Sequence, residues 1–528
     1  MDFYKFFRKP VSNYMSSYEQ KGVYGTIDNL NYIVGLSALD LKPISQDNLL
    51  EHATYFHEKI HWYQFIGTTS GFLVCSIMPM QFEMGIDLIR THTSNITSIK
   101  KPLIDNIPFD YKLNKLDGSV FMDLEKLALF LAIDTSLQWE MVNLILQNPE
   151  FISQFNYYAE SQFKENEELK NLKMASRIEE LTYTLFNSLC KFLMSIPNAN
   201  VDLIPNFSEE INKNKLPPSS IEALNLNLGF QHIIEGQARF YKLQHIFMFD
   251  KSFNLVVAKN KGYLNYDYSF AFDKYLEWSG LTRPTNPHSF TVFLFLIACE
   301  ISLMPHVGYP EEIKDYLTFI GDIHPGVRFN KICNAIKNDS FLKAWTLLDI
   351  QISPTYDMYL IAVDHICQET KFKSPLDICK TIVSCFEATD TQNSTMSDPF
   401  KFLIGRHIDF MRERVKCPEN FFWLFNSQLK SSGKSYENLE PPFISDINAE
   451  QMSNYRGPQI EKLEKHYLHF YLATQISKDL FRQLLFNRGP FSLNYTWIPK
   501  RDLDSGILET GINFFEYTIG RKLSDIKI

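Results

Sequence analysis

The chain has no long hydrophobic run that could cross a membrane. Its most apolar stretch, Phe290–Met304, falls short of the roughly 20 residues that a membrane-spanning helix needs, and it contains Glu300. We expect this stretch to form a buried helix. The N-terminal segment lacks the uninterrupted apolar core of a signal peptide, because Lys5, Arg8 and Pro10 interrupt it. We therefore expect no membrane partner.

Clustered cysteines and an excess of positive charge are also missing. The eight cysteines are scattered, and no two of them have Cys-x-x-Cys spacing, which argues against a disulfide framework and a zinc ribbon. Scattered thiols at this density are typical of a reducing cytosol, so we predict a cytoplasmic protein. The formal net charge of -9 argues against a primarily electrostatic nucleic-acid binder, and we expect no nucleic-acid partner.

Strand signals are few, whereas helical periodicity dominates nearly everywhere. Only Asn31–Ser37 and Phe491–Ile498 have strand character, and they could pair into a small sheet. The sequence thus predicts a mostly α, multi-helical protein with at most a small β element. The main helices are expected at Asp47–Ile66, Asp123–Leu146, Ser161–Met194, Ser220–Phe249, Ser289–Met304 and Pro325–Asn338. A further helix start is indicated at Pro310, which two acidic residues follow.

Polar stretches, the clearest of which are Ala388–Pro399 and Ser431–Gln459, separate shorter helices in the second half of the chain. We place domain boundaries near Asp339 and near Ser431. The predicted domains are a helical domain at 1–338, a helical region at 339–430, and a C-terminal helical region at 431–528 with short strands.

The residues His57-Glu58-Lys59-Ile60-His61 form an HExxH pattern inside the first predicted helix. Residues four apart lie one above the other on a helix, so His57 and His61 can offer two imidazole nitrogens to one metal ion. Glu58 would lie beside the metal, where its carboxylate can take a proton from a water that zinc activates. The alternative is a pair of partly buried histidines in a structural hydrogen-bond network.

This pattern resembles the zincin metallopeptidases, whose defining element is HExxH on a helix. The metzincin branch continues with a glycine and a third histidine, but Gln64 and Gly67 occupy those places. The gluzincin branch takes its third ligand from a glutamate on a later helix, and the best match is Glu235 in Ser220–Phe249. The resemblance therefore implies a zinc site that His57, His61 and Glu235 form together.

Two other residues compete with Glu235 as the third ligand. His232 lies one turn earlier on the same helix, and Glu300 lies in the apolar helix, where an unpaired carboxylate would be costly. Arg239 lies one turn beyond Glu235 and could orient its carboxylate. The alternative is that Glu235 is an exposed helix carboxylate that only pairs with Arg239.

Peptide hydrolysis also needs a donor for the oxyanion of the tetrahedral intermediate. The candidates are Tyr241, His306, and the cluster of Asp322, His324 and Arg328. We select His324 as the catalytic candidate, because a His-Pro pair followed by an arginine is similar to a feature of some membrane-type gluzincins. Its alternative role is that of a helix-entry residue that hydrogen-bonds a loop.

The sequence as a whole predicts a gluzincin-like zinc metallopeptidase that binds Zn2+ and acts on a protein or peptide substrate. Glu58 would be its general base. The large helical remainder suggests layers that restrict substrate access or bind a regulatory protein partner. The rival hypothesis is a catalytically inactive helical interaction or regulatory protein, in which the HExxH pattern is structural.

Overall fold

The computed structural model of the 528-residue chain describes the helix that carries the HExxH pattern, most of residues 226–419 and several shorter segments. The described residues are 25–28, 33–36, 49–76, 189, 226–315, 317–347, 355–387, 398–419, 443–446, 451–453, 506–520 and 522–526, with scattered positions from 473 to 493. The predicted helices Asp123–Leu146 and Ser161–Met194 lie outside these residues, apart from Leu189.

The chain forms two compact units, each built from segments that are far apart in the sequence. The first unit contains Met1–Leu39, Ile77–Met141 and Pro442–Ile528, and the second contains Asp40–Ser76 and Val142–Pro441. These divisions differ from the boundaries predicted near Asp339 and Ser431. Polar breaks mark where a chain can loop out, whereas each unit is held together by contacts between segments that are distant in the sequence.

The described part of the first unit contains a sheet of four short strands in the order β1-β2-β3-β4. The strands are β1 (Gly25–Asp28), β2 (Ile33–Leu36), β3 (Phe443–Asp446) and β4 (Gln451–Ser453). β1 and β2 pair antiparallel, β2 and β3 parallel, and β3 and β4 antiparallel. The unit also contains the helix α23 (Leu508–Ile519) and the short 3-10 helix η8 (Leu523–Asp525).

One of the two predicted strands is found in this sheet. β2 lies within the predicted strand Asn31–Ser37. It pairs with β1 and β3, and Ile33 is opposite Asp28 on one side and Phe443 on the other. The other predicted strand, Phe491–Ile498, lies outside the described residues except for Leu493, which belongs to no strand.

The described part of the second unit is helical. Its helices are α3 (Leu49–Gly67), a helix at 69–76, α10 (Phe230–Phe249), α11 (Leu255–Asn260), α12 (Tyr266–Ser279), α13 (Phe290–Ser302), α14 (Phe319–Ile323), α15 (Pro325–Asn338), α16 (Ser340–Leu347), α17 (Tyr356–Thr370), α18 (Pro375–Glu387) and α19 (Asp398–Lys416). With the small sheet of the first unit, these helices confirm the predicted mostly α fold.

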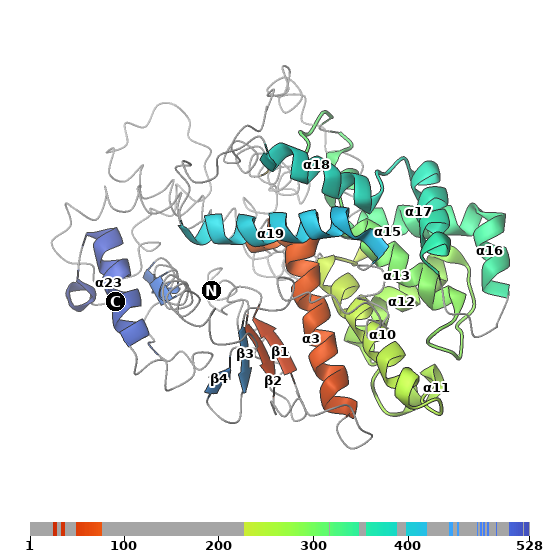
Figure 1. Cartoon of the computed structure of the whole chain (residues 1–528), viewed down its shortest axis with the longest axis horizontal. Coiled ribbons are helices and arrows are strands. Elements are labelled where there is room, and N and C mark those ends of the chain that lie inside the picture. Colours follow the sequence, from red (N-terminus) through yellow and green to blue (C-terminus); the bar gives the residue numbers. More distant parts are fainter. Residues whose placement is uncertain are drawn as a thin grey trace, which may run out of the picture. The chain divides into compact units, whose positions relative to one another are not determined.

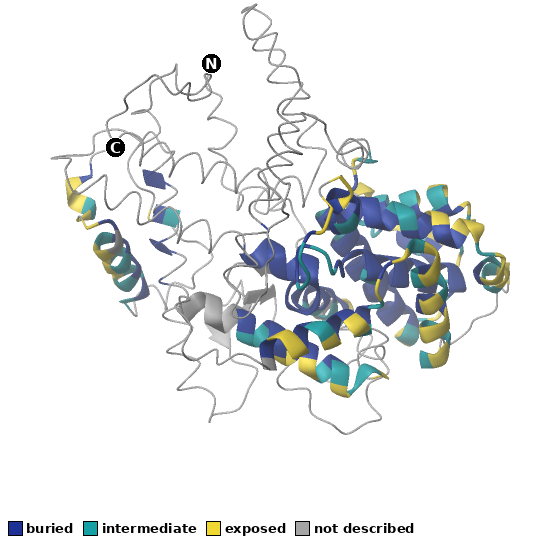
Figure 2. Cartoon of the chain, turned by 90° about the horizontal axis from the view of Figure 1, so that it is seen from above, coloured by how far each residue is buried: buried dark blue, intermediate teal, exposed yellow. Residues whose placement is uncertain are grey.

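The helix α10 is central to the packing of the second unit. It lies along α3 and also packs against α12 and α13, while α15 packs against α12, α13 and α17. Figure 1 shows α3 and α10 side by side. Buried residues gather in the interior of this unit, and exposed residues line its outer helices (Figure 2). The two helices expected to carry the site are therefore packed directly against each other.

The apolar helix α13 is buried, as its sequence predicts. Every residue of α13 except Glu300 is buried, and the Ser289 side chain accepts a hydrogen bond from the backbone N–H of Val292 at its start. Such caps satisfy an amide that has no partner inside the helix. Among the described helices, none has both the length and the apolar character that crossing a bilayer requires.

The helix α10 begins later than predicted. The chain has no helical structure at 227–229, and Asn227 has a positive φ of 50°, so the predicted helix Ser220–Phe249 is interrupted before Phe230. A close contact accompanies this interruption. Gly326, at the start of α15, lies so near Leu228 that a Cβ atom there would collide with the Leu228 carbonyl oxygen.

The two proline-based predictions of helix starts have opposite outcomes. Pro325 begins α15, which ends at Asn338 as predicted. Pro310 begins no helix, so that prediction is wrong. The Glu311 backbone N–H instead donates to the carbonyl of His306, and Glu311 forms an isolated bridge with Val307. The chain after Pro310 therefore forms a turn and a short bridge.

Candidate metal centre

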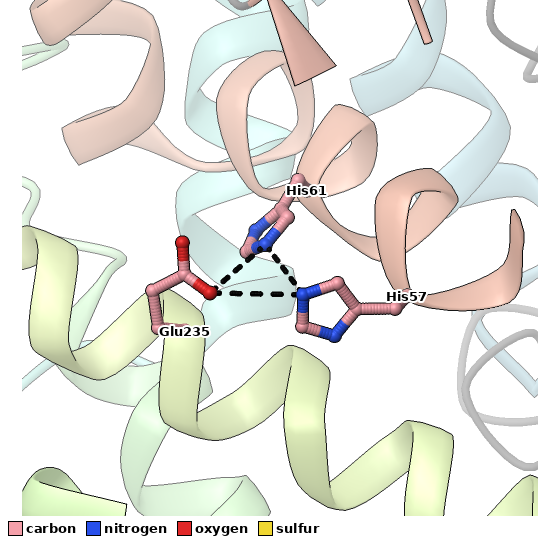
Figure 3. A group of neighbouring side chains, drawn as sticks. All are labelled: His57, His61 and Glu235. Carbon is pink, nitrogen blue, oxygen red and sulfur yellow. Dashed lines mark hydrogen bonds and ion pairs between the residues drawn. The ribbon is translucent and has the colours of Figure 1, made fainter. Parts of the chain in front are cut away.

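The helices α3 and α10 bring together His57, His61 and Glu235. One ligand atom from each residue lies within 4.8 Å of the others, and no other such group occurs in the described part of the chain. The Nε2 atoms of His57 and His61 are 3.1 Å apart. The Glu235 Oε2 atom lies 3.6 Å from His57 Nε2 and 3.4 Å from His61 Nε2. Figure 3 shows the three atoms converging from the two helices.

The triangle formed by these three atoms has the size that a tetrahedral zinc site requires. Ligand atoms at about 2.0–2.1 Å from a tetrahedral ion are separated from one another by about 3.3–3.4 Å. The three separations in this protein, 3.1, 3.4 and 3.6 Å, bracket that value. The donor set of two imidazole nitrogens and one carboxylate oxygen also matches a known class of catalytic zinc site.

A hydrogen-bond network fixes the orientation of His61. Its Nδ1 atom is 2.8 Å from the Oε1 atom of Gln64, and a neutral His61 that donates from Nδ1 can offer the Nε2 lone pair to an ion. The Gln64 Nε2 atom donates to the Ile234 carbonyl at 3.0 Å and to Oε1 of Gln237 at 2.7 Å. Gln237 donates in turn to the Leu296 carbonyl on α13. The network therefore connects α3, α10 and α13.

His57 is held mainly by packing. His57 is 5% exposed, and its ring meets the ring of Tyr268 edge-on with centroids 5.9 Å apart. Its Nδ1 atom is buried and has no hydrogen-bond partner among the described residues. The side chain of Glu235 is 25% exposed, so the group has one side open to solvent.

His57, His61 and Glu235 shift one another's pKa values. Burial lowers the pKa of His57 to about 3. Burial also opposes the charge on His61, but Glu235 and Glu58 outweigh it and raise the pKa of His61 to about 9. The two histidines hold the pKa of the Glu235 carboxyl well below its usual range, although burial opposes this.

Glu58 lies next to the ligand group but is not part of it. Burial raises the pKa of its carboxyl to about 7, while His61 and Lys242 oppose the shift. A carboxyl group with a pKa near neutrality can both accept and return a proton at physiological pH. Burial also lowers the pKa of Lys242 to about 7, and its Nζ atom donates to Thr54 Oγ1 at 2.8 Å.

Arg239 forms no ion pair with Glu235. Both sequence hypotheses, that Arg239 orients the Glu235 carboxylate as a metal ligand and that it pairs with an exposed Glu235, expected such a contact. Its guanidinium carbon lies 3.5 Å from the centroid of the Tyr268 ring, so the side chain stacks on α12. The sequence hypotheses also missed Tyr268, which contacts both His57 and Arg239. No local pattern marks Tyr268, since it comes close to the motif only through the packing of α12 against α10.

The two rival third ligands have other partners. His232 is buried at the start of α10, where its Nδ1 atom accepts a hydrogen bond from the Gly229 backbone N–H and its ring packs on Phe270. Glu300 forms an ion pair with Arg414 and accepts a hydrogen bond from the Tyr359 hydroxyl at 3.0 Å. The carboxylate in the apolar helix is therefore paired, as the cost of burying it requires.

The structure gives the predicted catalytic residue His324 a capping position. His324 is fully buried, and its Nδ1 atom accepts hydrogen bonds from the backbone N–H groups of Gly326 and Val327 at the start of α15. This is the helix-entry role that the sequence leaves as the alternative. His324 does not belong to the group formed by His57, His61 and Glu235.

Three other oxyanion candidates, Arg328, Tyr241 and His306, have the following surroundings. Arg328 is fully buried and donates to the backbone carbonyls of Ile301, Ser302, Met304 and Asp322. Tyr241 lines a pocket on the side of α10 that faces Glu300 and Arg414. Near neutral pH, burial keeps His306 uncharged by lowering its pKa to about 4.

Comparisons with models of protein families, with curated proteins and with solved structures gave no match to this chain.

Proposed function

We propose that the chain is a zinc-dependent metallopeptidase of the gluzincin type. The observation that carries the proposal is the convergence of His57 Nε2, His61 Nε2 and Glu235 Oε2 from two packed helices, beside the buried carboxyl of Glu58. The substrate would be a protein or a peptide. The resemblance of the HExxH pattern to zincins supports the same function.

His57, His61 and Glu235 would hold the metal. Two histidines and one carboxylate suit zinc best among the common divalent ions. Zinc in such a site supplies a Lewis acid and lowers the pKa of a water molecule to about 7. Gln64 would support the site by keeping His61 in the tautomer whose Nε2 lone pair faces the ion.

Glu58 would act as the general base and then as the general acid. Its carboxylate would accept a proton from the attacking water and return it to the amine that leaves when the peptide bond breaks. Burial supports this role, because it raises the pKa of Glu58 to about 7, near the pH at which the proton has to move in both directions.

The first experiment is elemental analysis of the purified protein after it has been loaded with zinc and dialysed. We expect about one zinc per chain, with loss of the metal in the double variant His57→Ala/His61→Ala and in Glu235→Ala. His365→Ala is the matched control, because this histidine pairs with Asp339 and lies outside the ligand group. No zinc in the wild-type protein would contradict the proposal and favour an inactive interaction protein.

The second experiment tests catalysis with Glu58→Gln. The variant should keep its zinc and its fold, since Glu58 is no ligand, but it should lose cleavage of a denatured-protein or random-peptide mixture by at least 100-fold. Equal cleavage by the wild type and by Glu58→Gln would exclude Glu58 as the base.

A further inference from the structure

Two buried cations lie on α10 beside the candidate metal centre, on the same face as Glu235. Arg239 follows Glu235 by four residues and Lys242 by seven, a spacing that places all three side chains on one stripe of the helix. Both cations are 7% exposed. The next residue along this face, His245, is also buried.

Neither cation has an anionic partner within ion-pair distance among the described residues. The Arg239 Nε atom is buried without a hydrogen-bond partner, and its guanidinium group stacks on the face of Tyr268. Lys242 donates to the hydroxyl of Thr54. A buried guanidinium group is costly unless it is paired, so Arg239, with Lys242 close beside it, indicates that an anion completes the site.

The carboxylates of the site do not satisfy these cations. Glu235 lies within 3.6 Å of both histidines. Glu58 is close enough for Lys242 and Arg239 to lower its pKa, but neither cation forms an ion pair with it. With Glu235 assigned to the metal and Glu58 to the proton transfer, the two cations remain available to a ligand.

The distances along the helices fit a peptide that extends away from the metal. Helical rise places the Cα atoms of Arg239 and Lys242 about 6 Å and 10 Å along α10 from that of Glu235. Helical side chains lean toward the N-terminus, which brings both cationic groups back toward the centre. An extended peptide advances by about 3.3–3.6 Å per residue, so the cations lie one to three residues from the scissile bond.

We propose that Arg239 and Lys242 bind a carboxylate of the substrate, one to three residues from the bond that is cleaved. This inference rests on the metal centre and the peptidase function proposed above. The carboxylate is either the C-terminal group of the peptide or an aspartate or glutamate side chain. Arg239, whose planar guanidinium can form two parallel hydrogen bonds with a carboxylate, would contribute most of the recognition.

The test measures binding separately from cleavage. Zinc-loaded, full-length Glu58→Gln protein is dialysed against three libraries of N-acetylated tetrapeptides. The first consists of neutral residues with a free C-terminal carboxylate, the second is its C-terminal amide, and the third is the amide with one glutamate. We expect the first or the third library to bind at least tenfold more tightly than the second. Which of the two binds identifies the source of the carboxylate.

Variants of the cations decide whether the two residues are responsible. In the same background, Arg239→Gln should reduce binding of the preferred library to that of the neutral amide without changing the zinc content. Arg239→Lys should retain part of the preference, and Lys242→Gln should weaken it. Lys259→Gln, which removes an exposed lysine on α11, is the matched control. If Arg239→Gln does not fold, Arg239→Lys and Lys242→Gln still provide the comparison.

The binding measurements either support or overturn the inference. Equal binding of all libraries, or no binding of any, would overturn the inference, as would an unchanged carboxylate preference in the Arg239 and Lys242 variants. A carboxylate preference that these variants abolish would support it. If wild-type protein shows this preference but cleaves no peptide of the preferred library, the peptidase proposal fails while the carboxylate site stands.

Discussion

Gln64 connects the two helices of the candidate metal centre through one side chain. Its amide oxygen contacts Nδ1 of His61, and its amide nitrogen donates to the Ile234 carbonyl and to Gln237, on either side of Glu235. The same residue thus orients one ligand and fixes the backbone next to another. Mutation of a hydrogen-bond partner of this kind typically lowers metal affinity or activity.

Replacing Gln64 with alanine should therefore weaken zinc binding while leaving all three ligands in place. We expect the dissociation constant for zinc to rise by about 10- to 100-fold. Competition with a chromophoric chelator measures this change. Gln368→Ala is the control, since that glutamine bonds only to Asp364 on the surface of α17. Unchanged affinity in Gln64→Ala would show that packing alone orients His61.

The proximity of the three candidate ligand residues could be predicted from the sequence, but their surroundings could not. HExxH and a later glutamate are local patterns with a fixed chemical meaning, and the structure brings those three ligand residues together. Gln64 is on the motif's own helix face, so helical spacing alone could have identified it. The stacking of Arg239 on Tyr268 and the capping role of His324 depend on how distant helices pack.

At the scale of elements, close approaches between helices explain where the helices begin and end. Gly67 is the last residue of α3, and a Cβ atom there would collide with the ring of Phe410 on α19. Gly326 has the same role between α15 and the segment before α10. Sequence patterns can indicate that a glycine ends a helix, but they do not identify the distant residue that requires it.

Gly326→Ala should destabilise the second unit, because the added methyl group meets a backbone carbonyl that no rotamer change can move. We expect a loss of about 1–3 kcal/mol, as for other overpacked sites, measured by urea unfolding. Gly405→Ala on α19 is the matched control, since nothing lies within 4 Å of its added Cβ atom. That change should raise stability by about 0.5–1 kcal/mol. Equal stability of both variants would contradict the close approach.

His407 joins α19 to α3 and should make this junction sensitive to acid. Its Nδ1 atom donates to the Ile66 carbonyl at 2.6 Å, its ring stacks on Phe72, and burial lowers its pKa from 6.5 to about 4. Between pH 6.5 and pH 4, His407 is protonated in the unfolded chain but stays neutral in the folded protein. The contribution to stability is therefore complete above pH 6.5 and is lost as the pH falls toward 4.

The size of this effect is on the order of 3 kcal/mol between the two pH values. His407→Gln keeps a donor for the Ile66 carbonyl but has no titrating group, so its unfolding free energy should decrease less between pH 7 and pH 4.5. Other buried histidines titrate in both proteins, and the difference between the two curves isolates His407. Parallel curves for His407→Gln and wild type would refute the assignment.

At the scale of the whole molecule, the order of segments along the chain does not match the order of the compact units. The second unit joins Asp40–Ser76 to Val142–Pro441, so α3, which carries two of the three candidate ligands, packs with helices that follow much later. The polar breaks near Asp339 and Ser431 do not reveal this arrangement, because it depends on contacts between segments that are hundreds of residues apart.

Truncation tests whether the chain can be divided at the predicted boundary. A chain that ends at residue 338 would lose α17 and α19. These helices supply Tyr359 and Arg414, which are the two partners of Glu300, and His407, which contacts the end of α3. The unpaired Glu300 and the uncovered apolar surface of α13 would each be costly. We expect the truncated protein to aggregate or to unfold without a cooperative transition, as seen by size-exclusion chromatography and circular dichroism. A monomeric 1–338 chain that unfolds cooperatively and binds one zinc would instead establish the predicted helical domain as an independent unit.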